Sequence, residues 1–153
     1  MYTFNLQTVL DHRQMLEDQL KRELAQIQRH LTLARQELGR LEDQVNATTV
    51  SLQQEQTAGM SSDRVVAVFA YLRRLSGQIT TQKALVADIE QKASTKRDEL
   101  NDALKRRKIL ENLKQQGLER YQRMILKKEM NFIDEIAVSR FARRAMAKNG
   151  EGQ

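Results

Sequence analysis

The sequence predicts an all-α protein: two long helices that form an antiparallel coiled-coil hairpin, with the second helix longer and overhanging. Apolar residues recur at alternating steps of three and four along most of the 153 residues. The chain has no proline and only six glycines, which argues against a turn-rich β-sandwich or barrel. Only one short interval breaks the pattern. We therefore expect a single domain over residues 1–153, with helices at about 4–56 and 64–146, a loop at about 57–63 and a frayed tail at 147–153.

The first predicted helix carries an apolar seam typical of a coiled coil. A repeat of 3.5 residues keeps one side of a helix towards a partner helix. The seam residues are Leu20, Leu24, Ile27, Leu31, Ala34, Leu38, Leu41, Val45 and Leu52, with Thr48 as the polar exception. Continued backward, the same register reaches Leu10 and Leu6.

The predicted loop contains residues suited to ending one helix and starting the next. Gly59 can take the left-handed conformation that ends a helix. Ser61, Ser62 or Asp63 can cap the following helix by accepting a hydrogen bond from a free backbone N–H. A loop of about seven residues is short enough to return the second helix antiparallel to the first.

The second predicted helix carries a matching seam. Its residues are Val65, Val68, Leu72, Leu75, Ile79, Gln82, Val86, Ile89, Ala93, Lys96, Leu100, Ala103, Arg107 and Leu110, after which it is expected to drift through Leu113, Gly117, Tyr121 and Ile125. With the turn near residue 60, the numbers of facing residues should add to about 120. This register pairs apolar residues such as Leu52 with Val68 and Leu31 with Ile89.

The seam also contains charged residues near the N-terminal end of the first helix. The register brings Arg13, Glu17 and Arg107 to one level. They could form a polar layer that fixes the register, because a buried charge needs a partner. Alternatively, their long side chains could extend to water at a loosely packed end, which is the interpretation we favour.

The C-terminal third is the predicted partner-binding region. Pairing should use up the shorter helix near residue 114, yet an apolar stripe continues beyond that point and needs a cover. Residues 105–148 carry 13 Lys and Arg against 5 Asp and Glu, a net charge of +8, which favours an acidic partner. The predicted partner-binding residues are Leu118, Arg120, Tyr121, Arg123, Ile125, Lys127, Lys128, Phe132, Asp134, Glu135 and Ile136.

Three kinds of partner could cover this stripe: another protein, a second copy of the chain, or a nucleic acid or membrane surface. We do not expect nucleic acid, because the segment has no aromatic stacking platform and Asp134 and Glu135 interrupt its basic field. A second, smaller docking patch is possible near the hairpin tip. Its candidates are Val66, Phe69 and Tyr71, which could instead widen the internal packing of the tip.

Composition gives no support to catalysis. The chain has no cysteine and two histidines, and it lacks phosphate-loop, nucleophile-elbow and zinc-protease motifs. We therefore expect a non-enzyme with no cofactor and no metal. The longest apolar run covers residues 65–72, far short of the roughly 20 residues of a transmembrane helix. With no signal-peptide pattern at the N-terminus, the sequence predicts a cytoplasmic protein without a transmembrane segment.

The sequence resembles the flagellar export protein FliJ family over nearly its whole length. The resemblance rests first on an N-terminal pattern that runs from Phe4 to Glu17 and includes Leu6, Val9, Leu10 and Arg13. After the loop, Tyr71, Leu72 and Leu75 match. Near the C-terminus, Lys128, Asp134, Glu135 and Ala137 match, followed by a basic finish.

This resemblance implies a component of the flagellar type III export apparatus, and hence a role in flagellum biogenesis and motility. The implied partners are the hexameric ring of the export ATPase, the export gate membrane protein and substrate-specific export chaperones. Such proteins are similar in shape to the stalk subunit of rotary ATPases, and the implied location is the inner face of the cell membrane. A virulence type III secretion homologue and a self-associating structural coiled coil remain alternatives.

Overall fold

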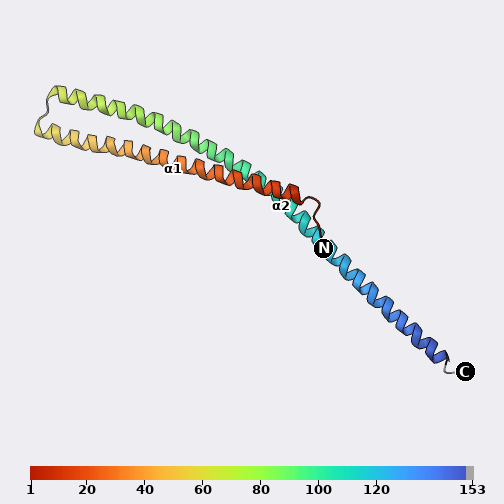
Figure 1. Cartoon of the computed structure of the whole chain (residues 1–153). Coiled ribbons are helices and arrows are strands. Elements are labelled where there is room, and N and C mark those ends of the chain that lie inside the picture. The colour runs from red at the N-terminus through yellow and green to blue at the C-terminus, as the bar shows by residue number, and fades with distance from the viewer. Residues whose placement is uncertain (151–153) are drawn as a thin grey trace. The chain divides into compact units, whose positions relative to one another are not determined.

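The computed structural model describes residues 1–150. Two helices account for nearly all of this part: α1 covers Gln7–Ala58 and α2 covers Ser62–Gly150, with no strand among the described residues. Figure 1 shows the two helices joined by a short turn and packed side by side as a hairpin. α2 is the longer helix, so the fold class is the one that the sequence predicts.

The loop is shorter than the sequence analysis suggests. Only residues 59–61 lie outside the helices, because both helices continue into the interval 57–63. At the other ends, α1 begins at Gln7 rather than near residue 4, and α2 continues through residues 147–150 of the expected tail. Residues 151–153 of that tail lie outside the described residues.

The turn uses the glycine and one of the three candidate caps. Gly59 has a φ of 93°, in the left-handed region that side chains disfavour, and its N–H donates to the carbonyl of Gln56 at 3.3 Å. The hydroxyl oxygen of Ser61 accepts a hydrogen bond from the backbone N–H of Arg64 at 3.3 Å. Ser61 is therefore the residue that caps α2.

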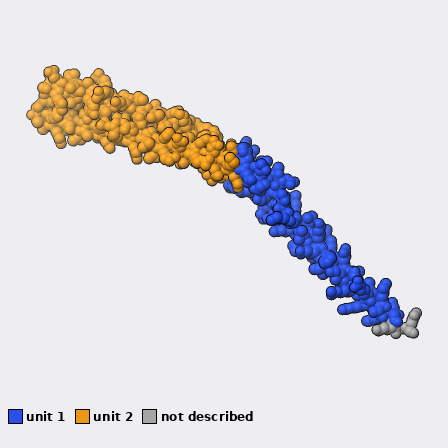
Figure 2. All heavy atoms as spheres, viewed as in Figure 1, with its two compact units in different colours: residues 1–13, 105–153 blue, residues 14–104 orange. Residues whose placement is uncertain are grey.

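Figure 2 colours two compact units: unit 2 is residues 14–104, and unit 1 is residues 1–13 with the chain from residue 105 onward. Within unit 2, α1 and α2 pair through the predicted seam. Leu31, Ala34 and Val86 form a buried cluster, against which Leu38 and Ile89 pack. The pairs Leu31 with Ile89 and Ala34 with Val86 have numbers that add to 120, which is the register that the sequence predicts.

The polar seam positions of α2 are satisfied by hydrogen bonds within unit 2. The side-chain amide of Gln82 donates to the carbonyl of Ala34 at 2.9 Å. The ammonium group of Lys96 donates to Glu23 at 2.9 Å and to Glu99 at 3.0 Å. Since a buried polar group without a partner costs about 1–3 kcal/mol, these bonds let polar residues occupy an otherwise apolar seam.

In unit 1, the N-terminal residues pack against α2 further along than expected. The ring of Tyr2 lies 5.8 Å from the ring of Tyr121, measured between centroids, and the Met1 amino group donates to the Tyr121 hydroxyl at 2.7 Å. The prediction that pairing ends near residue 114 is therefore wrong. The residues that precede α1 are not helical, so a few of them span more of α2 than a helix would.

Two predicted seam positions are also wrong, one at each end of the pairing in unit 1. Leu6 is 42% exposed because it precedes the first turn of α1, and Phe4 is half-buried in its place. Leu113 is 46% exposed, while Lys114 and Leu118 are half-buried. The inward side shifts by one residue here, because a straight helix drifts relative to a strict repeat of 3.5 residues.

Candidate partner-binding surfaces

The last part of α2 is exposed along its whole length. Among residues 1–150, Ile125 is the last that is half-buried, and every residue from Leu126 to Gly150 is exposed. We call residues 126–150 the exposed end of α2, which is the blue segment of Figure 1. Its large apolar side chains are between 38% and 76% exposed: Leu126, Met130, Phe132, Ile133, Ile136, Val138, Phe141 and Met146.

The predicted partner-binding residues divide into two groups within unit 1. Leu118, Tyr121 and Ile125 are half-buried, and Tyr121 contacts Tyr2. The expectation that Tyr121 lacks an intramolecular partner is thus wrong. The remaining eight are exposed: Arg120, Arg123, Lys127, Lys128, Phe132, Asp134, Glu135 and Ile136. An apolar surface without a cover in this unit therefore begins near residue 126 rather than near residue 114.

Local sequence explains why the last part of α2 is helical without a second helix beside it. Residues 118–149 include no proline or glycine and are rich in Leu, Met, Arg, Lys, Glu and Ala, which lose little conformational freedom in a helix. Arg123 also lies 3.8 Å from Glu119, one turn earlier. Such i,i+4 pairs add a few tenths of a kcal/mol to an exposed helix.

Charge is unevenly distributed along the exposed end. Residues 126–137 contain two lysines and three acidic residues, a net charge of −1. Residues 138–150 contain four basic residues and no acidic residue, a net charge of +4. The cationic character of the exposed end is therefore concentrated in its last turns.

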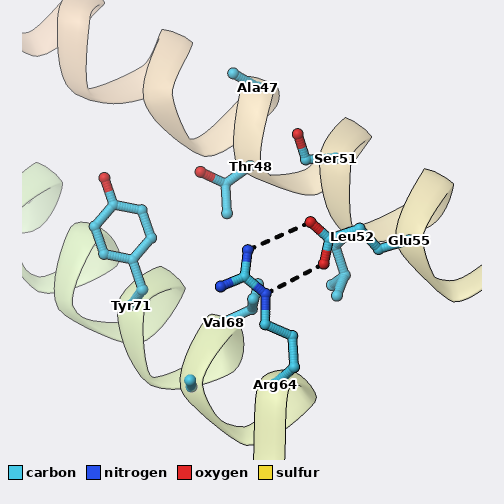
Figure 3. A pocket seen from close by; sticks show the side chains of 9 residues that line it. Ala47, Thr48, Ser51, Leu52, Glu55, Arg64, Val68 and Tyr71 are labelled. Atoms are coloured by element: carbon cyan, nitrogen blue, oxygen red, sulfur yellow. Dashed lines mark hydrogen bonds and ion pairs between the residues drawn. The ribbon is translucent and has the colours of Figure 1, made fainter. Parts of the chain in front are cut away.

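A hollow of about 390 Å³ lies between α1 and α2 near the hairpin tip. Figure 3 shows Arg64 of α2 reaching across it to Glu55 of α1, with both of its hydrogen bonds at 3.3 Å. Tyr71 also lines the hollow and is half-buried, with the Arg74 guanidinium 5.4 Å from its ring centroid. The Arg64–Glu55 ion pair thus links the two helices across the hollow.

Of the predicted tip patch, Val66 is 68% exposed and Phe69 is 48% exposed. Tyr71 differs from both, because its ring faces the hollow that Figure 3 shows. The three residues therefore do not form one continuous apolar surface. Two exposed apolar side chains on one helix are common on protein surfaces, so the tip is the weaker candidate for docking.

The predicted polar layer contains one buried charge. Glu17 is 4% exposed, and its carboxylate forms an ion pair with the Lys21 ammonium group at 2.9 Å. The favoured interpretation, in which the side chains of all three residues extend to water, is therefore wrong for Glu17. In unit 1, Arg13 and Arg107 are half-buried, and Arg107 forms an ion pair with Glu111.

The family model described as "Flagellar FliJ protein" matches residues 2–146 of the chain. The chain belongs to the FliJ family. No curated protein matches it, and no solved structure matches it. The FliJ family is a non-catalytic component of flagellar export, so membership gives this chain a role related to that export. The matched residues include all the predicted partner-binding residues of α2.

Sequence reasoning missed one feature of this FliJ family member: the contact between Tyr2 and Gly117 in unit 1. A Cβ atom at Gly117 would come within 2.1 Å of the Tyr2 hydroxyl oxygen. Glycine inside a long helix is unfavourable by about 1 kcal/mol, so its presence in line with the seam was a signal of close approach.

Among residues 1–150, no three His, Asp or Glu side chains are grouped as a metal ion requires. Across the same residues, no helix has both the length and the apolar character needed to cross a membrane.

Proposed function

We propose that this chain is a non-enzymatic component of the flagellar export apparatus that binds the hexameric export ATPase through the exposed end of α2. The observation that carries the proposal is the continuous exposure of residues 126–150, apolar side chains included, in a member of the FliJ family. In this role the exposed end is the part that docks, as the stalk of a rotary ATPase does.

The physical argument concerns uncovered apolar area. Burying one large apolar side chain is worth about 1.5–3 kcal/mol, and eight such side chains lie along the exposed end. Entry of such a helix into a partner's groove or lumen removes these side chains from water and so lowers the free energy of the system. The basic side chains among them add long-range attraction to an acidic partner.

Contacts with the export gate and with substrate chaperones belong to the same proposal, because FliJ family membership implies export and these are its other components. The hairpin of unit 2 has exposed side chains on both helices that could serve them. The proposed location is the cytoplasm, at the inner face of the cell membrane. The proposed consequence for the cell is assembly of flagella and hence motility.

A self-associating coiled coil is the competing function, and the observation that favours it is the same row of exposed apolar side chains, which a second copy of the exposed end could cover. Sedimentation equilibrium of the purified chain separates the two functions. A monomer at concentrations where the ATPase binds supports export docking. A stable dimer that excludes the ATPase would contradict it.

The test is charge reversal of four predicted partner-binding cations at and just before the start of the exposed end, which attract an acidic partner at long range. Replacing Arg120, Arg123, Lys127 and Lys128 by Glu should weaken binding to the export ATPase about tenfold or more, mainly through slower association at low salt. The matched control reverses four exposed cations of unit 2: Arg22, Arg29, Arg73 and Lys83. Both variants should keep the helical circular dichroism of the parent. An equal loss of ATPase binding in the two variants would contradict the proposal.

A further inference from the structure

The exposed end of α2 has two apolar faces on opposite sides of the helix. The first face is made by Leu126, Phe132, Ile133 and Ile136; the second is made by Val138, Phe141, Ala142, Ala145 and Met146. Met130 lies between the two faces, about 20° around the helix from Phe141. At about 100° per residue, two residues nine positions apart point in directions about 180° apart. Phe132 and Phe141 are nine apart, as are Ile136 and Ala145. The apolar side thus changes sides between residues 137 and 138.

The charged side changes over at the same point. Lys127 and Asp134 lie on the side opposite the first face, and the same line of the helix continues as Val138 and Phe141, four and seven residues after Asp134. Conversely, the line through Ile136 continues as arginine four and seven residues later, at positions 140 and 143. Only Glu129 lies within the first face itself.

Both faces are uncovered. Phe132 is 63% exposed and Phe141 is 75% exposed, and neither residue has a helix beside it in unit 1. A partner that lay along one side of α2 would cover the first face and then meet arginines. A partner along the other side would meet lysine and aspartate first. One flat groove therefore cannot cover both apolar faces without burying charge, which is costly.

We propose, on the basis of the proposed function, that the exposed end docks through these two faces onto opposite walls of its protein partner, at two levels along α2. The wall at the level of the first face is apolar with mixed charge, since residues 126–137 are close to neutral. The wall at the level of the second face is apolar with an acidic rim, because residues 138–150 carry +4. The charged side at each level stays in water.

Labelling of single cysteines tests this inference, and the chain has no native cysteine to interfere. The four variants are Phe132→Cys on the first face, Phe141→Cys on the second face, and Lys127→Cys and Arg140→Cys on the two charged sides. All four positions are exposed in the free chain and should react with a maleimide at similar rates. Binding of each variant to the assembled export ATPase is measured separately by cosedimentation.

In the complex, labelling at positions 132 and 141 should slow about tenfold or more, because the core of an interface excludes water. Labelling at positions 127 and 140 should stay within about threefold of the free rate, as is usual for a solvated rim. Protection of 132 and 140 together, with 127 and 141 open, would mean one-sided docking and would overturn the inference. Protection of all four would mean full enclosure and would also overturn it.

If a cysteine substitution weakens binding, insertions that rotate the second face relative to the first provide a second measurement. Two alanines inserted between Ala137 and Val138 rotate the second face by about 200° and bring both faces to one side. Four alanines rotate it by about 40° beyond a full turn and keep the faces opposed. The two-residue insertion should weaken binding at least tenfold more than the four-residue insertion.

Equal effects of the two insertions would overturn the inference of opposite walls, while leaving the ATPase role standing. A chain that shows no protection at any of the four positions and no binding in cosedimentation would instead contradict the proposed function as well. Circular dichroism at 222 nm confirms that each insertion variant remains helical.

Discussion

The Tyr2 ring lies over Gly117 of α2 so closely that a Cβ atom there would be 2.1 Å from the hydroxyl oxygen and 3.1 Å from Cζ of Tyr2. The same ring meets Tyr121 at an interplanar angle of 43°. Absence of a side chain at position 117 is therefore what lets the N-terminal residues approach α2 in unit 1. The uncovered part of α2 begins within ten residues of this contact, at Leu126.

Replacing Gly117 by Ala should fail to stabilise the protein. In an exposed helix interior, Gly→Ala raises the free energy of unfolding by about 0.5–1 kcal/mol. Gly77 is the matched control and should show this gain, because a Cβ atom added there would meet no neighbouring group within 4 Å. At Gly117 the gain should be cancelled, because the displaced Tyr2 loses an aromatic contact worth about 0.5–1.5 kcal/mol. Urea unfolding followed by circular dichroism measures both.

A Tyr2→Ala background makes the Gly117 comparison decisive. Without the ring, Gly117→Ala should recover the gain seen for Gly77→Ala, since nothing then occupies the space. Equal stabilisation by the two alanines with Tyr2 in place would show that the N-terminal residues do not depend on the glycine.

Two leucines of α1 in unit 2 should respond very differently to truncation. Leu31 is 6% exposed and belongs to the buried cluster, whereas Leu33 is 63% exposed. Leu31→Ala should lower the free energy of unfolding by about 2–4 kcal/mol through lost burial and a residual cavity. Leu33→Ala should change it by no more than about 0.5 kcal/mol. Similar losses for both would mean that the seam of unit 2 is not the stabilising element.

The hairpin was predictable because its cause is local and repeated. Each seam residue of unit 2, from Leu31 to Ala93, follows from a spacing that holds over many turns, and one error in the pattern changes little. The turn was predictable in kind from Gly59 and Ser61. Its length was not, because Thr57 and Ala58 have no feature that stops a helix.

The N-terminal contact was not predictable from the spacing. Residues 1–6 precede α1, so no helical phase places Tyr2 over Gly117. Similarly, an apolar stripe was visible beyond Leu118, but counting apolar residues does not show that the stripe changes sides. That change appears only when Phe132 and Phe141 are compared along one continuous exposed helix.

The turn between the helices should be sensitive at two positions. Gly59 has a φ of 93°, so Gly59→Ala should lower the free energy of unfolding by about 1–2 kcal/mol. Ser61→Ala removes the cap on the Arg64 N–H and should cost about 0.5–2 kcal/mol. Ser62→Ala is the control and should be nearly neutral. Thermal unfolding measures all three. Equal losses of stability for Ser61→Ala and Ser62→Ala would mean that Ser61 is not the residue that caps α2.

The ion pair of Glu23 with Lys96 should make the stability of unit 2 depend on pH in a defined window. The Lys96 hydrogen bond, assisted by Gln19, lowers the pKa of Glu23 below 4.5, and the Glu23 and Glu99 hydrogen bonds raise the pKa of Lys96 above 10.5. The stabilisation that goes with a lowered carboxyl pKa is fully present above the unfolded-state pKa, and it is lost as pH falls through the folded-state pKa. The stabilisation that goes with a raised ammonium pKa is fully present below the unfolded-state pKa, and it is lost as pH rises through the folded-state pKa.

Glu23→Gln should therefore lower the unfolding temperature at pH 7, and the difference from the parent should shrink as pH falls through the lowered pKa of Glu23, because the parent carboxylate is then protonated as well. The pair lies partly in solvent, so the effect should be small and should shrink further in high salt. Glu42→Gln, at an exposed position of α1, is the matched control and should change the unfolding temperature little. Calorimetry between pH 3 and pH 8 measures both variants. A difference that persisted undiminished at pH 3 would mean that Glu23 contributes through packing rather than through its charge.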